Sequence, residues 1–121
     1  DTVGVVGAQV RACLDEISGE GSESIVVAYE PIWAIGSGRA ASIDEIVEMH
    51  SAIRAFLVKT YGEEEGAAVR ILYGGSVNAE NAAEIIAGDE VGGALVGGAS
   101  LSAESFMNIV LAVQEVITNR D

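Results

Sequence analysis

Three short apolar runs, each followed by a loop and then a helical pattern, constrain this chain most. The runs span residues 25–29, 69–73 and 94–96. The run at 25–29 is rich in β-branched residues and apolar on both faces, which is typical of a strand buried on both sides. The alternation of all three runs with helices predicts an α/β fold with parallel strands and right-handed crossovers. The loops after them are rich in glycine. Because ligands bind at the carboxyl ends of parallel strands, these loops are where a functional site is expected.

Four helices are predicted around the strands. Helical spacing of apolar residues predicts the first, over residues 3–17, and a capping box formed by Ser42 and Glu45 begins the second, which ends near Gly62. Asn78 is expected to cap a short third helix that closes at Gly88. The last helix starts near Ser102, and its predicted inner stripe is Phe106, Ile109, Val110, Val113, Val116 and Ile117. The run of glutamates at 63–65 is interpreted as a solvated acidic patch.

Composition narrows the class of protein. The 121 residues suit one domain, residues 1–121, and half of them are hydrophobic. A single cysteine, Cys13, cannot form an internal disulfide, which favours a cytoplasmic location. We expect no membrane span and no signal peptide. The net charge of −13 argues against a nucleic-acid partner, and it leaves backbone amides to attract any anionic substrate.

Glu30 is the leading candidate for chemistry, because it directly follows the first predicted strand and precedes Pro31. A carboxylate in a partly dry site at a strand end is a good proton acceptor near neutral pH. The alternative is a glutamate that caps or pairs at the strand end.

The segments Gly74-Gly75-Ser76 and Gly97-Gly98 suit close approach of the backbone to a phosphate. The alternative for each is a tight turn between strand and helix. The segment 36–41 matches the dinucleotide pattern G-x-G-x-x-A, but six residues separate it from its strand, so we interpret it as part of a mobile lid.

His50 is the only histidine, and it falls on the apolar stripe of the second helix, which predicts a satisfied core residue. With one histidine, one cysteine and no spaced cluster, no metal site is expected. Cys13 is expected to be inert packing.

Three motifs, at residues 28–38 (AYEPIWAIGSG), 72–77 (LYGGSV) and 95–101 (LVGGASL), closely resemble the triosephosphate isomerase family, in order and at family-like spacing. The resemblance implies interconversion of dihydroxyacetone phosphate and glyceraldehyde 3-phosphate through an enediolate, in glycolysis and gluconeogenesis, without a cofactor. This family is a standard example of acid–base tuning and lid closure.

The resemblance also implies residue roles. Glu30 matches the general base, and residues 31–41 match the lid. The amide donors to the substrate phosphate match Gly36, Ser76, Gly97 and Gly98. Tyr73 and Ser76 match the loop that supports the closed lid, and His50 matches a helix position without catalytic duty.

A (β/α)8 barrel typically needs about 250 residues. The chain therefore resembles a partial barrel, with three parallel strands (strands 6–8 of the family barrel) and four helices. The lysine and histidine that the family uses belong to the missing amino-terminal portion. We expect an isolated half with open strand edges to be nearly inactive, and to pair with a complementary half or a second copy as a homo-oligomer. The alternative is a non-catalytic phosphate-binding or self-assembling module.

Overall fold

The computed structural model describes residues 2–14, 25–31 and 41–119, and its centre is a three-stranded parallel sheet. The strand order is β1 (Val26–Tyr29), β2 (Arg70–Tyr73) and β3 (Gly93–Ala94). Val26 lies opposite Arg70 and Leu72 opposite Gly93, so the carboxyl ends of the strands meet at one edge. The predicted α/β class with three parallel strands is confirmed.

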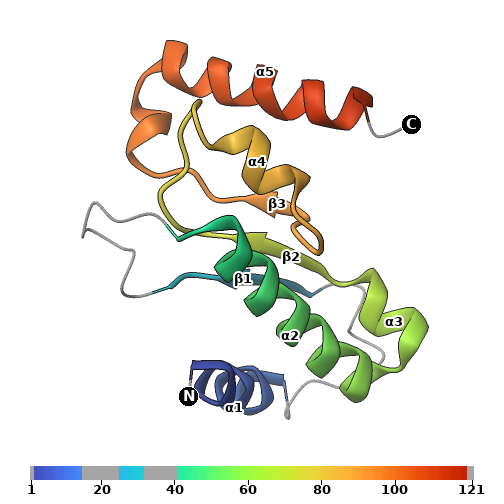
Figure 1. Ribbon diagram of the computed structural model, residues 1–121. Helices are drawn as coiled ribbons and strands as arrows, with labels where there is room; N and C mark the ends of the chain where they lie inside the picture. The colour runs from blue at the N-terminus through green and yellow to red at the C-terminus, as the bar shows by residue number, and fades with distance from the viewer. Residues whose placement is uncertain (1, 15–24, 32–40, 120–121) are drawn as a thin grey trace.

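Helices cover one face of the sheet. In Figure 1, α2 (Ile43–Tyr61) crosses in front of the strands, with α1 (Thr2–Leu14) near β1 and α5 (Ala103–Asn119) at the opposite end. Val69, Ile71 and Tyr73 are almost completely buried on this side, against Ile46, Ile53 and Leu57 of α2 and their neighbours. The hydrophobic effect therefore fixes which face of β2 turns toward the helices.

The other face of the sheet is open. Val26 is 58% exposed, Leu95 is 40% exposed, and Ala28 and Glu30 are also exposed. The prediction of a strand buried on both sides at residues 25–29 is therefore wrong for this chain. The sequence has the apolar character of a strand covered on both faces, but the described residues cover only one of them.

The capping box of α2 is confirmed, since the Glu45 amide donates to Ser42 Oγ at 3.1 Å and the Ser42 amide donates to Glu45 Oε1 at 3.2 Å. The helix ends at Gly62, whose φ of 93° favours glycine. A further helix, α3 (Glu63–Ala68), follows at once. The three glutamates of the predicted acidic patch are exposed, but they form the first turn of α3, where the helix dipole favours negative charge.

The later elements begin or end away from their predicted bounds. Asn78 Oδ1 accepts from the Asn81 amide at 3.0 Å, as a cap would, but it closes only a turn, and α4 (Ala82–Ala87) begins afterwards. Strand β3 stops at Ala94 instead of residue 96, although the Leu95 amide still donates to the Tyr73 carbonyl at 2.8 Å. Residues Gly98–Leu101 form a short 3₁₀ helix.

The inner stripe of α5 is half of the predicted one. Ile109 is buried, and Val113 and Val116 pack on the same core. Phe106, Val110 and Ile117 are 40–56% exposed. The sequence pattern is wide enough for two contact faces, and the described residues supply only one. No helix in the described ranges is long and apolar enough to cross a membrane.

His50 lies wholly inside the core, with its ring at 6.1 Å from that of Tyr29 and 6.4 Å from that of Tyr73. Its Nδ1 lies 3.0 Å from the Glu90 carbonyl, so Nδ1 carries the proton and donates. Nε2 has no partner among the described residues. The prediction of a satisfied core histidine is therefore right for one ring nitrogen only.

Arg54 joins three segments. Its Nη1 donates to the carbonyls of Gly66 at 2.6 Å and Val69 at 2.5 Å, and its Nε pairs with the Glu90 carboxylate.

We expect Arg54→Ala to lower the free energy of unfolding by about 2–3 kcal/mol, because two partly buried carbonyls lose a charged donor. Urea denaturation measures this. Lys59→Ala, on the exposed side of α2, is the control, with a change within about 0.5 kcal/mol, and equal effects of the two substitutions would refute the role of Arg54.

Burial lowers the pKa of His50, and so does Arg54, whereas the bond to the Glu90 carbonyl and the Glu90 charge raise it in part. The folded protein therefore keeps His50 neutral at a pH where the unfolded chain, with a histidine pKa of about 6.5, takes up a proton. The contribution of neutral His50 to the free energy of unfolding is complete above pH 6.5 and decreases below it.

We expect the free energy of unfolding to fall between pH 7 and 5.5, and His50→Asn to flatten that dependence. Parallel profiles for the two proteins would contradict it.

Candidate active site

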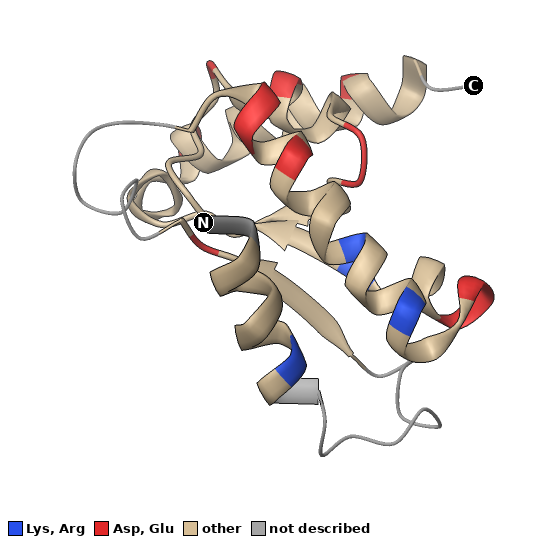
Figure 2. Ribbon diagram, turned by 60° about the horizontal axis from the view of Figure 1, so that its bottom comes forward, with Lys and Arg blue, Asp and Glu red and all other residues tan. Residues whose placement is uncertain are grey.

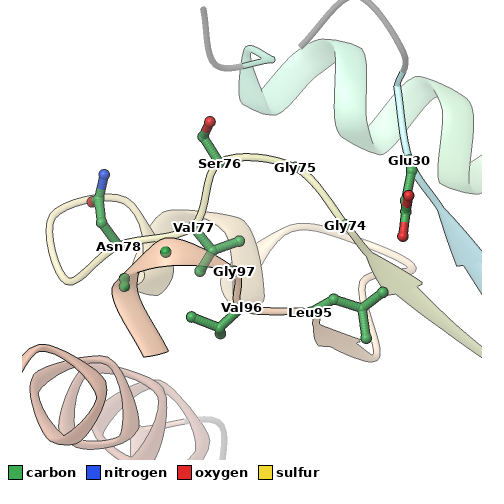
Figure 3. A pocket seen from close by; sticks show the side chains of 11 residues that line it. Glu30, Gly74, Gly75, Ser76, Val77, Asn78, Leu95, Val96 and Gly97 are labelled. Atoms are coloured by element: carbon green, nitrogen blue, oxygen red, sulfur yellow. The ribbon is translucent and has the colours of Figure 1, made fainter. Parts of the chain in front are cut away.

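A cavity of about 590 Å³ opens at the carboxyl ends of the three strands. Each strand contributes its following segment to the lining (Figure 3). The lining consists of Glu30 after β1, Gly74, Gly75, Ser76, Val77 and Asn78 after β2, and Leu95, Val96, Gly97, Gly98 and Ala99 around the end of β3. The structure thus brings together the predicted residues Glu30, Ser76, Gly97 and Gly98.

Glu30 continues the alternation of β1, so its side chain leaves the sheet on the open face. The Gly74 amide donates to the Tyr29 carbonyl at 2.8 Å, which extends the ladder between β1 and β2 to the edge of the cavity. The Glu30 side chain is exposed. The partly dry surroundings expected for this carboxylate are therefore not provided by the described residues alone.

The missing side chain of Gly74 leaves the space that the Glu30 side chain occupies. A Cβ atom at Gly74 would lie 2.7 Å from Glu30 Cγ, 3.3 Å from Glu30 Oε1 and 3.2 Å from Leu95 Cδ1. Figure 3 shows Gly74 at the end of β2, facing the Glu30 side chain. Sequence reasoning assigned the glycine pair to phosphate binding and missed this contact, and it did not single out Leu95. The only available signal was the paired glycine itself.

A hydrogen-bond network fixes the backbone beyond Ser76. Asn81 Nδ2 donates to the Ser76 carbonyl at 2.8 Å, and the Asn78 amide donates to Asn81 Oδ1 at 2.8 Å. Asn78 Oδ1 in turn accepts from the amides of Glu80 and Asn81. These reciprocal bonds hold the loop that carries Ser76 against the start of α4.

The backbone at Gly97 and Gly98 is open to the cavity. A Cβ atom at either position would meet no other atom within 4 Å. Both the amide and the hydroxyl of Ser100 donate to the Gly97 carbonyl, at 2.9 and 2.6 Å, which closes the 3₁₀ turn behind these glycines. The open space leaves room for an anionic group to approach the peptide units.

Tyr73 is buried below the cavity, and its hydroxyl occupies the space where a Cβ of Gly75 would lie. Burial raises the pKa of Tyr73, the Ala41 backbone lowers it in part, and Glu45 raises it further. Ala41 is the last residue of the predicted lid, so Tyr73 is adjacent to the end of that segment. Residues 32–40 of the lid, which include Gly36, lie outside the described residues, as does the side chain of Cys13.

Neither His50 nor Lys59 lines the cavity. Lys59 is exposed in the last turn of α2, and His50 is enclosed beneath the sheet, as their helical positions predict. Among the described residues, no group of three or more His, Cys, Asp or Glu side chains is arranged to hold a metal ion. Glu30 is therefore the one ionisable side chain that lines the cavity among the residues that the structure describes.

A family model and individual relatives point to the same protein family. A family model for triosephosphate isomerase matches residues 1–113. Similar relatives include triosephosphate isomerases of Caulobacter vibrioides, 57% identical over 92% of this chain, and Chloroflexus aurantiacus, 52% identical over 88%. The match covers 43% and 42% of these relatives, in their carboxyl-terminal part. The chain thus spans less than half the length of the enzymes it matches.

Proposed function

Since the chain belongs to the triosephosphate isomerase family, we propose that it supplies the proton-transferring part of a triose-phosphate isomerase. In this proposal the remaining part of the barrel completes the site, and the assembly works in the cytoplasm, in glycolysis and gluconeogenesis. The observation that carries the proposal is the cavity in which Glu30 faces the loops of Ser76, Gly97 and Gly98. A carboxylate on one side and exposed peptide groups on the other suit a substrate with an acidic C–H bond and a phosphate.

In the proposed reaction, a Glu30 carboxylate oxygen takes a proton from the carbon next to the substrate carbonyl, and the electron pair of that C–H bond forms the enediolate. The proton of the substrate hydroxyl passes to the former carbonyl oxygen, a transfer that the completing part would assist. The same carboxyl returns a proton to the neighbouring carbon, which yields the isomeric triose phosphate. Ser76, Gly97 and Gly98, with Gly36 of the lid, bind the phosphate through backbone amides. No cofactor takes part, because the proton leaves and returns without net oxidation.

The family's lysine and histidine would come from the completing part. The described side chains that line the cavity include no cation to stabilise the enediolate oxygens. We therefore propose that the chain alone has negligible activity, since stabilisation of developing charge supplies a large share of catalysis.

The first test is Glu30→Gln in the chain assembled with the amino-terminal remainder of the Caulobacter vibrioides enzyme. We expect a loss of kcat of roughly 10²- to 10⁴-fold, the usual contribution of a positioned general base. Isomerisation of glyceraldehyde 3-phosphate measures it, with Glu48→Gln, exposed on α2, as the control. Unchanged activity would exclude Glu30 as the base.

The same variant separates catalysis from simple phosphate binding. Titration with a phosphate-bearing mimic of the enediolate should show weaker binding by Glu30→Gln than by the unmodified chain. Binding that does not depend on Glu30 would instead favour the non-catalytic phosphate-binding module, because the glycine loops alone would then account for it.

A second prediction concerns the space that Gly74 leaves for the Glu30 side chain. Gly74→Ala places a methyl group against Glu30 Cγ and should displace the carboxylate, because real Cβ atoms do not approach to 2.7 Å. A displacement near 1 Å can cost about 100-fold in kcat. Gly98→Ala is a matched control for kcat, since a Cβ there has open space and should act mainly on KM. Equal kcat in the two variants would contradict the role of Gly74.

A further inference from the structure

Strand β3 is too short to fix its own position, although it leads to the glycine loop of the cavity. It consists of Gly93–Ala94, and a further glycine, Gly92, precedes it. Register is weakly specified in glycine-rich strands. The amides of Gly92 and Leu95 each donate to a β2 carbonyl at 2.8 Å, so β3 is held at its two ends. Whatever holds the chain before Gly92 therefore affects where Gly97 and Gly98 lie.

The turn that leads into β3 contains a residue in an unfavourable backbone conformation. Glu90 has a φ of 66°, in the left-handed region that favours glycine. It is the one residue other than glycine with a positive φ in the ranges that the structure describes. Such a conformation persists only where neighbouring groups hold it. The turn before β3 therefore needs support from another element.

Two side chains of α2, one helical turn apart, supply that support. His50 Nδ1 donates to the Glu90 carbonyl at 3.0 Å, and Arg54 Nε pairs with the Glu90 carboxylate. In Figure 2 the acidic turn of residues 89–90 runs beside α2. The carboxylate is the end of a flexible side chain that is 36% exposed, whereas the carbonyl belongs to the strained backbone itself. The bond from His50 is therefore the one that fixes the peptide unit.

The His50 ring makes no second hydrogen bond within the described part of the chain. It is inaccessible to solvent, its Nε2 has no partner there, and its remaining neighbours include the rings of Tyr29 and Tyr73. A leucine would fill this place without leaving a buried nitrogen unpaired, which costs free energy. The bond from Nδ1 to the Glu90 carbonyl is thus the particular contribution that a histidine makes at this position.

We propose that His50 is a positioning residue for phosphate binding. Its Nδ1–H fixes the Glu90 carbonyl, the turn at Glu90 sets the place of β3, and β3 carries Gly97 and Gly98 to the cavity. His50 does not line the cavity, so it acts through the backbone and not by contact with substrate. The link to the substrate rests on the proposed function, whereas the effect on β3 does not.

The first test compares His50→Leu with His50→Asn in the 121-residue chain. Leucine keeps the apolar volume and loses the donor, whereas asparagine keeps a donor at the δ position. Amide hydrogen exchange is followed by NMR at Gly92 and Leu95, relative to the Gly74 amide, which donates to the Tyr29 carbonyl on the other side of β2. The relative rate should rise at least about tenfold in His50→Leu and less than about threefold in His50→Asn, because only the first variant loses the bond.

Normalising to Gly74 separates a local role from a change in overall stability, because global opening would speed exchange at all three amides alike. A relative rate that rises equally in the two variants, or does not rise in His50→Leu, would overturn the inference. If His50→Leu does not fold, the tautomer of the unmodified chain decides. Nitrogen-15 NMR should find the ring proton on Nδ1, and a proton on Nε2 would overturn the inference.

The second test measures isomerisation of glyceraldehyde 3-phosphate by the chain assembled with the amino-terminal remainder of the Caulobacter vibrioides enzyme. His50→Leu should raise KM about tenfold with a smaller change in kcat, because the phosphate is the same group in substrate and transition state. His50→Asn should return KM to within about threefold of the unmodified chain. An unchanged KM in His50→Leu would overturn the role in phosphate binding. An unmodified assembly without activity would exclude the proposed function, while the exchange rates would still decide the role of His50 in placing β3.

Discussion

The burial of one face of β2 is the constraint on which the rest of the described structure depends. β2 is the strand with a neighbour on each side, and Ile71 and Tyr73 are inaccessible to solvent beneath α2. The alternation of side chains then sends Arg70 and Leu72 to the opposite face. The same register places Gly74 next to both Glu30 and Leu95. The positions of the base, the phosphate loops and the open face therefore follow from which side of one strand faces the helices.

Much of the fold could be predicted from the sequence because local signals and burial agree. The capping box at Ser42 and the apolar runs at 25–29 and 69–73 each specify their element without help from distant residues. The prediction was wrong where tertiary contacts decide. α3 was missed because three glutamates in a row resemble a solvated loop, although a helix start tolerates them. The strand at 25–29 and the stripe of α5 were assigned too much buried surface, because apolar spacing does not reveal whether a second contact partner is present.

In the candidate site, too, local sequence signals were sufficient for some residues, whereas others depended on tertiary contacts. The residue types and their places after strands indicated Glu30, Ser76, Gly97 and Gly98, and the topology brings them to one cavity. The role of Gly74 was not accessible, since a missing side chain carries no chemical signal until its neighbours are known. The half-satisfied environment of His50 was also hidden, because helical spacing reports burial but not which ring nitrogen finds a partner.

The open face of the sheet links the proposed completion of the barrel to the chemistry of Glu30. Val26, Ala28 and Glu30 leave β1 on the same side, so a surface that covers the first two residues also displaces water from around the third. Water around a carboxylate stabilises its charge and weakens it as a base, and electrostatic interactions strengthen when water is excluded. Docking of a partner on the sheet would therefore do more than add missing groups. It would change the medium in which Glu30 works, so assembly and proton transfer would depend on the same uncovered strand face.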